Sequence, residues 1–392
     1  MTYRGAAPNV LANIRFSERP APSTILEFRN VPHASAVLSA RDDQNRASWL
    51  PPDPPASKAV LDDMKATARR MAVHCAAYKG ALPARAWGQI LTTAVPFIAV
   101  VLAMFATVDT NYLLTLLLAI PGGGLLVRFF IIQHDCGHGS FWASRAANDA
   151  TGRIMSLLTI TPYALWRREH AQHHATSGHL EKRGVGDIST LTIKEYLALS
   201  PLRRFVYRLY RHPLFLFGFG VPFYFLVIQR LPWGHPYPAR DTWKSIMGLN
   251  LALLAVYAPI AYFVGVKELF LVALPMLHIA TATGGWLFYI QHQFEDTQWD
   301  TADEWSFQAA ALHGSSYYAL PPVLNWFTGN IGLHHIHHLN SMIPNYRLVD
   351  CITASPELSA LNRLTLSDSW KCAGLKLWDE ESRMMVGFDG VG

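Results

Sequence analysis

Three short histidine clusters are the part of this sequence best suited to chemistry. They are His134-Asp-Cys-Gly-His138, His170-Ala-Gln-His173-His174 and His334-His335-Ile-His337-His338, in a chain that holds 17 histidines. Histidines that are three or four positions apart share one face of a helix. Each cluster can therefore direct two or three imidazoles at one place, which is what a metal site requires.

A further histidine, His292, stands in YIQHQFED at the end of the last long apolar block. Counting one face per cluster, the sequence predicts nine metal ligands: His134, His138, His170, His173, His174, His292, His334, His337 and His338. Nine imidazoles are too many for one metal ion. They suit two ions with four or five ligands each, which leaves coordination positions open for oxygen.

The expected cofactors are two iron ions, with dioxygen as co-substrate. Neutral imidazole is a good iron ligand, and iron with dioxygen can break an unactivated alkyl C–H bond, which no side chain can do. Soluble di-iron proteins use Glu-x-x-His pairs on a four-helix bundle instead. This chain contains no Glu-x-x-His, so that class is disfavoured.

Two neighbours of the ligands are candidates for outer contacts. Asp135 stands beside His134 and can accept an imidazole N–H; the alternative is a solvated loop acid. His335 falls off the shared face of its cluster. We predict no catalytic residue beyond the metal ligands, and the remaining histidines are interpreted as ordinary core or surface residues: His179, His212, His235, His278 and His313.

Apolar and polar blocks alternate along the chain and indicate an all-α polytopic membrane protein. Two apolar stretches are each long enough for a hairpin of two spans, because about 20 apolar residues cross a bilayer. The expected segments are a disordered or extended tail (1–58), an interfacial amphipathic helix (59–88), transmembrane hairpin 1 (89–133), a cytosolic and interfacial region with clusters 1 and 2 (134–244), transmembrane hairpin 2 (245–291) and a cytosolic helical cap with cluster 3 (292–392). For residues 59–88 a plain soluble helix remains the alternative.

The distribution of charge predicts which side of the membrane holds the clusters. Arginine and lysine are concentrated in residues 134–244, whereas the two hairpin turns carry few charges. The positive-inside rule places 134–244, the metal site and both termini in the cytoplasm. Because His134 and His292 must face one site, an even number of crossings separates them. The run 213–231 is interrupted by prolines and glycines, so we expect it to lie at the interface or to re-enter, giving four true spans.

Composition excludes several other classes. Hydrophobic residues make up 51% of the chain and charged residues 16%, against about 25% charged in average soluble chains. The net charge of +5 is modest, and the basic residues lie between apolar blocks, which fits contact with membrane lipids and not nucleic acid. Four scattered cysteines without a CxxC encode neither a zinc ribbon nor an iron–sulfur site. The first residues lack the apolar core of a cleavable signal peptide.

The pattern HDCGH, HAQHH and HHIHH resembles the three histidine boxes of the membrane fatty acid desaturases, over most of residues 89–382. YIQHQFED, GNIGLHHIHHLNSMIPNYRL and LKLWDEESRMMVGF are similar to bacterial members of the ω-6 (Δ12) acyl-lipid branch. The resemblance implies four spanning helices, a cytosolic di-iron site and an acyl tunnel in a bacterial inner-membrane protein. It carries over the same nine histidines as ligands. Phe288 stands where the acyl-CoA desaturases have an asparagine that binds metal through water, which puts the neighbouring ligand His292 in question.

The expected activity is therefore insertion of a double bond into a fatty-acyl substrate. The acyl carrier is left open among lipid, CoA and ACP. The sequence holds no HPGG-type cytochrome b5 domain and no GxGxxG fingerprint, so electrons are expected from a separate ferredoxin, rubredoxin or cytochrome b5-like donor. The basic residues at 203–211 are interpreted as lipid-headgroup contacts, or as a docking site for such a donor.

Three rival functions remain to be tested. An alkyl or carotenoid hydroxylase or ketolase uses similar boxes and differs in its product. A membrane metal transporter would place polar ligands inside the spans near the midplane, but the long apolar blocks hold only His278 and Arg128 as such residues. A haem-binding electron carrier would need facing histidines within spans, and the sequence offers too few.

Overall fold

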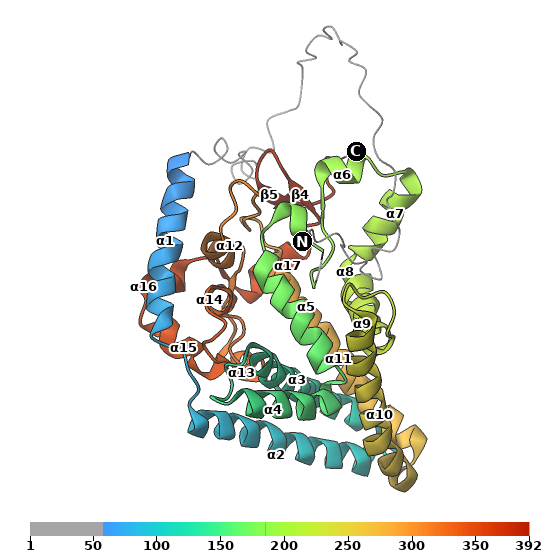
Figure 1. Cartoon of the computed structure of the whole chain (residues 1–392). Coiled ribbons are helices and arrows are strands. Elements are labelled where there is room, and N and C mark those ends of the chain that lie inside the picture. Colours follow the sequence, from blue (N-terminus) through green and yellow to red (C-terminus); the bar gives the residue numbers. More distant parts are fainter. Residues whose placement is uncertain (1–57, 185, 392) are drawn as a thin grey trace.

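A computed structural model describes residues 58–184 and 186–391, and these residues are mainly helical (Figure 1). The all-α prediction is confirmed at this level. The predicted tail, 1–58, lies outside the described residues except for Lys58. Five helical segments of the described chain are long and apolar enough to cross a membrane, judged by length and composition. Four of them match the two predicted hairpins, and the fifth is Pro213–Arg230.

The first hairpin consists of α2 (Pro83–Thr107) and α3 (Tyr112–His138). Asn111 ends the turn between them and caps α3, because its side-chain oxygen accepts a hydrogen bond from the N–H of Leu114 at 3.1 Å. The glycines of α3 allow a close approach to α11: a Cβ at Gly123 would lie 2.6 Å from the side chain of Ile279.

The second hairpin consists of α10 (Ala239–Val264) and α11 (Val266–His292), which meet at Gly265. Gly265 has φ +94°, a conformation that other residues rarely adopt. Lys267 follows this turn, and its ammonium lies 3.8 Å from the carboxylate of Asp109 in the turn of the first hairpin. The two turns are therefore neighbours, and α3 and α11 run from them side by side.

Both α3 and α11 continue beyond the predicted ends of the spans. The helices include His134, His138 and His292, which were expected just outside the hairpins. The same helices that carry the long apolar stretches therefore also position these imidazoles. Between the hairpins, residues 213–230 form an irregular rod with a π-helical turn. It comprises α8 (Pro213–Phe215), η3 (Leu216–Gly220), α9 (Val221–Leu226) and η4 (Ile228–Arg230).

Short helices and small strands form a cap at one end of the two hairpins (Figure 1). Its helical elements are α4 (Arg145–Thr159), α5 (Tyr163–Thr176), η2 (Leu180–Lys182), α6 (Ile193–Leu197), α7 (Pro201–Tyr210), α12 (Phe307–His313), α13 (Pro322–Phe327), α14 (His334–Leu339), α15 (Asn345–Thr353), α16 (Pro356–Ala360) and α17 (Leu366–Cys372). Its strands are β1 (Leu191–Thr192), β4 (Leu377–Asp379) and β5 (Met384–Val386) in one sheet, and β2 (Tyr317–Tyr318) with β3 (Arg363–Leu364) in another. In the first sheet β1 is parallel to β4, and β4 is antiparallel to β5.

Helix α1 (Lys58–Ala76) differs from the interfacial helix expected over 59–88. Its apolar face, with Ala68, Met71 and Cys75, is buried against Ile336 and Cys351 of the cap. In Figure 1 α1 stands beside α12, α14 and α15. The apolar face of this amphipathic helix therefore packs on the helix of the third histidine cluster.

Candidate metal centre

Four helices bring the predicted ligands together. His134 and His138 end α3, and His292 ends α11. The second cluster lies in the last two turns of α5, and the third forms most of α14. The Schellman-type end of α3 explains why its ligands stop there, since Gly139 follows His138 in the left-handed region with φ +77°.

All nine predicted ligands fall into two compact groups. In each group the ring nitrogens that could bind a metal lie within 4.8 Å of one another. Group 1 holds His134, His138, His170, His174 and His337; group 2 holds His173, His292, His334 and His338. The two groups are built from all three clusters and His292, so neither can form from one segment of chain alone.

The Nε2 atoms point at one another within each group. In group 2, Nε2 of His292 lies 3.1 Å from that of His173 and 3.0 Å from that of His334. In group 1, Nε2 of His174 lies 3.1 Å from that of His170 and from that of His337. Phe288 does not keep His292 out of the group: its ring packs 5.3 Å from the imidazole of His292, centroid to centroid.

Hydrogen bonds on the far side of several rings fix which nitrogen faces the centre. Nδ1–H of His134 donates to the Asp135 carboxylate at 3.0 Å, and Nδ1–H of His292 donates to the Gly314 carbonyl at 3.1 Å. Nδ1–H of His173 donates to the Asp187 carboxylate at 2.5 Å. These partners accept and cannot donate, so each ring presents an unprotonated Nε2 to its group.

This donor set fits a metal ion in each group. Unprotonated nitrogens repel one another at about 3 Å unless a cation lies between them. The Nε2 atoms of His134 and His138 are buried and have no hydrogen-bond partner, which is costly for a polar atom unless it binds something else. Neutral imidazole suits iron, zinc and copper, so the residues present are compatible with the di-iron prediction.

The surroundings keep the cap histidines neutral. Burial, and then the charges of neighbouring imidazoles, hold the pKa well below the ordinary histidine range for His170, His174, His334, His337 and His338. A neutral imidazole has the lone pair that a metal requires. The same burial that opposes protonation therefore favours ligation at physiological pH.

Asp135 ties the first cluster to the cap. Its second carboxylate oxygen accepts two hydrogen bonds from Asn345, from the backbone N–H at 2.6 Å and from the side-chain amide at 2.8 Å. Gln89 of α2 in turn donates to the side-chain oxygen of Asn345 at 3.0 Å. Asp135 thus has the outer contact suggested by the sequence and is not a solvated acid, being 1% exposed.

His335 is placed differently from the expectation of an outer contact. Its Nε2 bonds the carbonyl of Leu358 at 3.0 Å and its Nδ1 has no partner, so it makes no hydrogen bond to any of the nine histidines. The five histidines interpreted as ordinary lie outside both groups. Of these, His235 pairs with Glu169, from Nδ1 to Oε1 at 3.1 Å.

Asp187 is a site residue that the sequence did not reveal. It lies in the loop after the second cluster and reaches His173 because Gly186 brings the backbone close to α5. A Cβ at Gly186 would lie 3.1 Å from the carbonyl oxygen of Glu169 and 3.3 Å from Cβ of His173. Gly186 also has φ +71°. The glycines in GVGD were the available signal, although nothing in their spacing names His173 as the partner.

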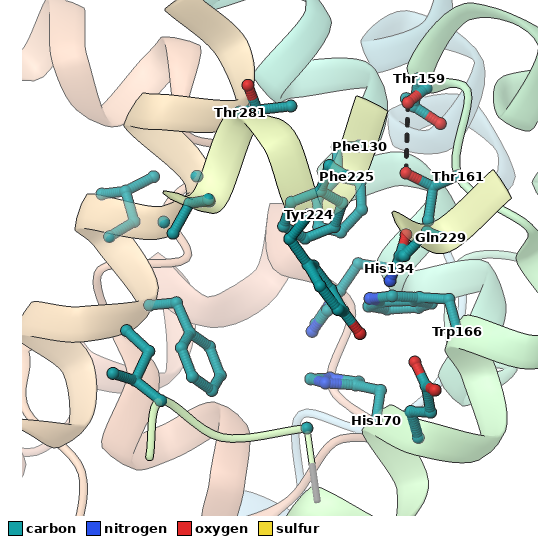
Figure 2. A pocket seen from close by; sticks show the side chains of 18 of the residues that line it. Phe130, His134, Thr159, Thr161, Trp166, His170, Tyr224, Phe225, Gln229 and Thr281 are labelled. Carbon is teal, nitrogen blue, oxygen red and sulfur yellow. Dashed lines mark hydrogen bonds between the residues drawn. The ribbon is translucent and has the colours of Figure 1, made fainter. Parts of the chain in front are cut away.

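A cavity of about 260 Å³, here cavity 1, reaches the histidines from between the long apolar helices α3 and α11. Its walls are largely apolar and include Leu126, Phe130 and Ile131 of α3, Leu277 and Ala280 of α11, and Phe225 of α9. It ends at His134 and His170 of group 1 and His334 of group 2. Figure 2 shows His134, His170 and Trp166 at this end, with the hydroxyl of Tyr224 directed toward them. Trp166 stacks on the His170 ring, with centroids 4.6 Å apart.

Comparison with known proteins assigns the chain to a family. A model of the fatty acid desaturase family matches residues 110–366. A fatty acid desaturase of Bacillus subtilis is 39% identical over 303 residues, covering 77% of this chain and 86% of the relative. An sn-1 oleoyl-lipid 12-desaturase of Synechocystis sp. is 26% identical, covering 67% of this chain and 74% of its own. An sn-1 acyl-lipid omega-3 desaturase (ferredoxin) of the same organism is 25% identical, and the match covers 65% of this chain and 71% of the relative. The chain belongs to the fatty acid desaturase family.

Proposed function

We propose that this protein is an oxygen-dependent desaturase that inserts a double bond into the acyl chain of a membrane lipid. The observation that carries the proposal is the position of cavity 1. Its walls are apolar side chains of α3, α9 and α11, and it ends on histidines of both metal groups. An acyl chain in this cavity would be held alongside the metal centre, with the carbons to be oxidised next to it.

The nine histidines would hold two iron ions, five ligands from group 1 and four from group 2. Iron with dioxygen supplies the oxidant for an unactivated C–H bond. The side chains orient the rings and exclude water: Asp135, Asp187 and the Gly314 carbonyl fix three imidazoles. Trp166 and Phe288 pack against His170 and His173 and shield them on the side of the cavity. A dry apolar cavity also limits side reactions.

The proposed topology has four spans, α2, α3, α10 and α11, with the metal centre, the cap and both termini in the cytoplasm of a bacterial cell. Three contacts support a re-entrant path for 213–230. Phe217 packs on Tyr289, one helical turn before the end of α11, and Val221 lies over Gly285 one turn further in. The chain then returns to the metal end, where Tyr237 donates to the amide oxygen of Gln172 on α5 at 3.1 Å.

The remaining partners follow from chemistry and from the relatives. Desaturation with dioxygen consumes two electrons from outside, and we propose that a separate donor, a ferredoxin, rubredoxin or cytochrome b5-like protein, supplies them. Lipid is the proposed acyl carrier, since two relatives are named for acyl lipids. The name of one of them includes ferredoxin, which supports a separate electron donor. The position of the ligands at helix ends, away from the middle of the spans, favours an enzyme over a metal transporter.

The test is expression in a bacterium that lacks desaturases, followed by mass spectrometry of fatty-acid methyl esters. The expected result is a new double bond in the lipid fraction. The bond should disappear in His138→Ala, His173→Ala and His337→Ala, whereas His212→Ala, with its exposed ring outside both groups, should retain it. Acyl chains carrying a new oxygen and no double bond would identify a hydroxylase or ketolase instead. Activity in two of the three ligand variants would refute the site.

A further inference from the structure

Helix α7 presents an apolar stripe that no part of the described chain covers. Leu202, Phe205, Val206 and Leu209 are 71%, 64%, 36% and 45% exposed. Their spacing of three, four and seven positions places them on one face of the helix. The opposite face is anchored to the cap, because Nε of Arg208 donates to the hydroxyl of Tyr196 at 2.6 Å and Tyr207 is buried. The exposed stripe is therefore held outward on a fixed helix.

The stripe is continuous with an apolar segment of membrane character. Helix α7 leads directly into residues 213–230, one of the five segments apolar enough to cross a membrane. In that segment Leu214 is 80% exposed and Phe219 is 54% exposed. Figure 1 shows α7 and α8 following one another at the edge of the molecule, above α9 and α10. The exposed side chains of 213–230 and the stripe of α7 therefore form one continuous apolar surface, and a lipid layer that covers the first can also cover the second.

A second cavity, cavity 2, of about 290 Å³, opens beside the same helix. Arg203, Val206, Tyr207 and Tyr210 of α7 line it, and at its inner end it reaches His173 and His292 of metal group 2. Cavities 1 and 2 share five residues in their walls: Gly184, Asp187, Ile188, Tyr210 and Phe288. The two cavities therefore approach the metal centre from two sides and are divided by these residues.

Basic side chains lie in the wall of cavity 2 and behind it. Arg183 lines it together with Arg203, and Arg211 is fully buried behind its Thr190 and Gln293 wall. The guanidinium of Arg211 donates to neutral oxygens, among them Thr190 Oγ1 at 3.0 Å and Gln293 Oε1 at 2.9 Å. The one carboxylate in the lining, Asp187, is engaged by His173. Arg183 pairs with Glu195, so the positive field at the cavity comes from Arg211, which donates to neutral oxygens, and it favours an anionic group at the mouth.

We propose that α7 lies in the headgroup layer of the membrane and that cavity 2 is the entrance through which a membrane phospholipid delivers an acyl chain to the metal centre. The apolar stripe inserts among the acyl chains, as in other interfacial helices. Arg203, at the rim between the stripe and cavity 2, contacts the lipid phosphate. Delivery of an acyl chain has a purpose only if the protein is a desaturase, so this proposal rests on the proposed function. Its tests measure membrane insertion and lipid binding and need no desaturase activity.

The first test measures the depth of α7 in proteoliposomes. Nitroxides are attached at Leu202→Cys and at Phe205→Cys, with Glu381→Cys, exposed on the β4–β5 turn, as the control. The four native cysteines are buried and should react little. The labels on α7 should be relaxed more by dissolved oxygen than by a water-soluble nickel complex, and the control should show the reverse. Labels on α7 that behave like the one at Glu381 would overturn the proposal.

The second test identifies what occupies cavity 2. The protein is reconstituted in phosphatidylcholine vesicles with phosphatidylglycerol whose acyl chain carries a diazirine, and the cross-linked peptides are sequenced after illumination. Labelling is expected within residues 188–210 and 288–293. Arg203→Gln should lower it about five-fold, the equivalent of ~1 kcal/mol for one basic residue at an anionic surface. Arg69→Gln, an exposed arginine of α1, should not change it.

The outcomes separate this proposal from the proposed function. Labelling of cavity 2 by a soluble acyl-CoA diazirine but not by the phospholipid would refute the lipid entrance, even in an active desaturase. Equal labelling in wild type and Arg203→Gln would also refute it. The protein could instead make no double bond and still show phospholipid labelling that depends on Arg203. That result would support the lipid entrance and reject the proposed desaturase activity.

Discussion

The carboxylate of Asp187 lies 2.5 Å from Nδ1 of His173, on the side of the ring opposite Nε2, which faces His292 and His338. His173 is 1% exposed, whereas the side chain of Asp187 is 21% exposed, so the carboxylate contacts the buried ring from the edge of the protein. A carboxylate in this position fixes the tautomer and orientation of a ligand ring and raises its basicity. The loop that follows the second cluster is therefore part of the metal centre.

Replacing this carboxylate should weaken the site without destroying the fold. Asp187→Asn keeps the size of the side chain but loses the charge that binds Nδ1–H of His173. Loss of such outer contacts typically lowers metal affinity or activity by about 10–100-fold. Iron retained during dialysis against a chelator, and turnover of the iron-loaded enzyme, measure the two effects. Asp303→Asn, an exposed carboxylate in a nearby turn, is the matched control. Wild-type iron retention and turnover in Asp187→Asn would contradict the assigned contact.

The number of metal ions is the second prediction. Active purified protein should contain about two irons per chain, because two separate groups of imidazoles each offer four or five donors. His138→Ala removes a donor from group 1 alone and His292→Ala removes one from group 2 alone, so each variant should lose iron from its own group first. Elemental analysis gives the number of irons per chain, and activity is measured on the same samples. Active protein with a single metal ion would reject the two-metal centre, and zinc counts only if activity accompanies it.

The sequence predicted which histidines gather in the two groups better than it predicted their surroundings, for a physical reason. Ligands on one helix face are set by spacing, which is local, so the three clusters were visible directly. His292 was found because it ends an apolar block. Asp187 could not be assigned, because its partner is 14 positions away and the contact depends on the course of a loop.

The same limit applies to surfaces. The pattern of α1 identified an amphipathic helix, but amphipathicity does not say whether protein or lipid covers the apolar face. The packing of Met71 and Cys75 on the cap is a long-range contact. The sequence placed His134 and His138 on one helix face just beyond the first hairpin, but it could not show that this helix is the continuation of the apolar helix α3.

A buried lysine behind cavity 2 provides a prediction about pH. Lys376 is 7% exposed, and burial, followed by the charge of Arg211, lowers its pKa from 10.5 to about 7. The folded chain therefore binds fewer protons than the unfolded chain between about pH 7 and 10.5, and the free energy of unfolding should rise with pH across this window. The cost of burying the lysine is fully present below the window and absent above it.

Lys376→Met removes this cost. The variant should be more stable than wild type by about 1–2 kcal/mol at neutral pH, or a few degrees in apparent Tm, by analogy with buried charges replaced by apolar residues. The gain should shrink toward the upper end of the window. Thermal unfolding of both proteins in detergent at several pH values measures the difference in stability between variant and wild type. The other titratable groups are the same in the two proteins, so their contributions cancel in this difference. Lys371→Met, at a side chain that is 81% exposed, should change little. A gain that stays constant with pH would show that burial of charge is not its origin.

The last prediction concerns the path of the chain through the membrane. Asp109 stands in the turn of the first hairpin, and its carboxylate lies 3.8 Å from the ammonium of Lys267, which directly follows the turn of the second hairpin, so both turns must be on one side. His138 and His292 end α3 and α11 at the other side, where they join the two metal groups. Helix α10 begins at the metal end, since Asp241 pairs with Arg168 of α5 at 3.2 Å. A crossing by residues 213–230 would therefore leave α10 starting on the wrong side.

Cysteine labelling from outside intact cells tests this path. Single cysteines are placed at Asp109, Lys267 and Trp233; the first two have side chains that are 62% and 73% exposed, and Trp233 is 64% exposed. A membrane-impermeant maleimide should react at Asp109→Cys and Lys267→Cys, and at Trp233→Cys only after the cells are permeabilised. Glu381→Cys, on the cap, should behave like Trp233→Cys. Reaction at Trp233→Cys from outside would mean that 213–230 crosses the membrane. In that case His292 could not share a site with His134, and the four-span topology would fall together with the metal centre built on it.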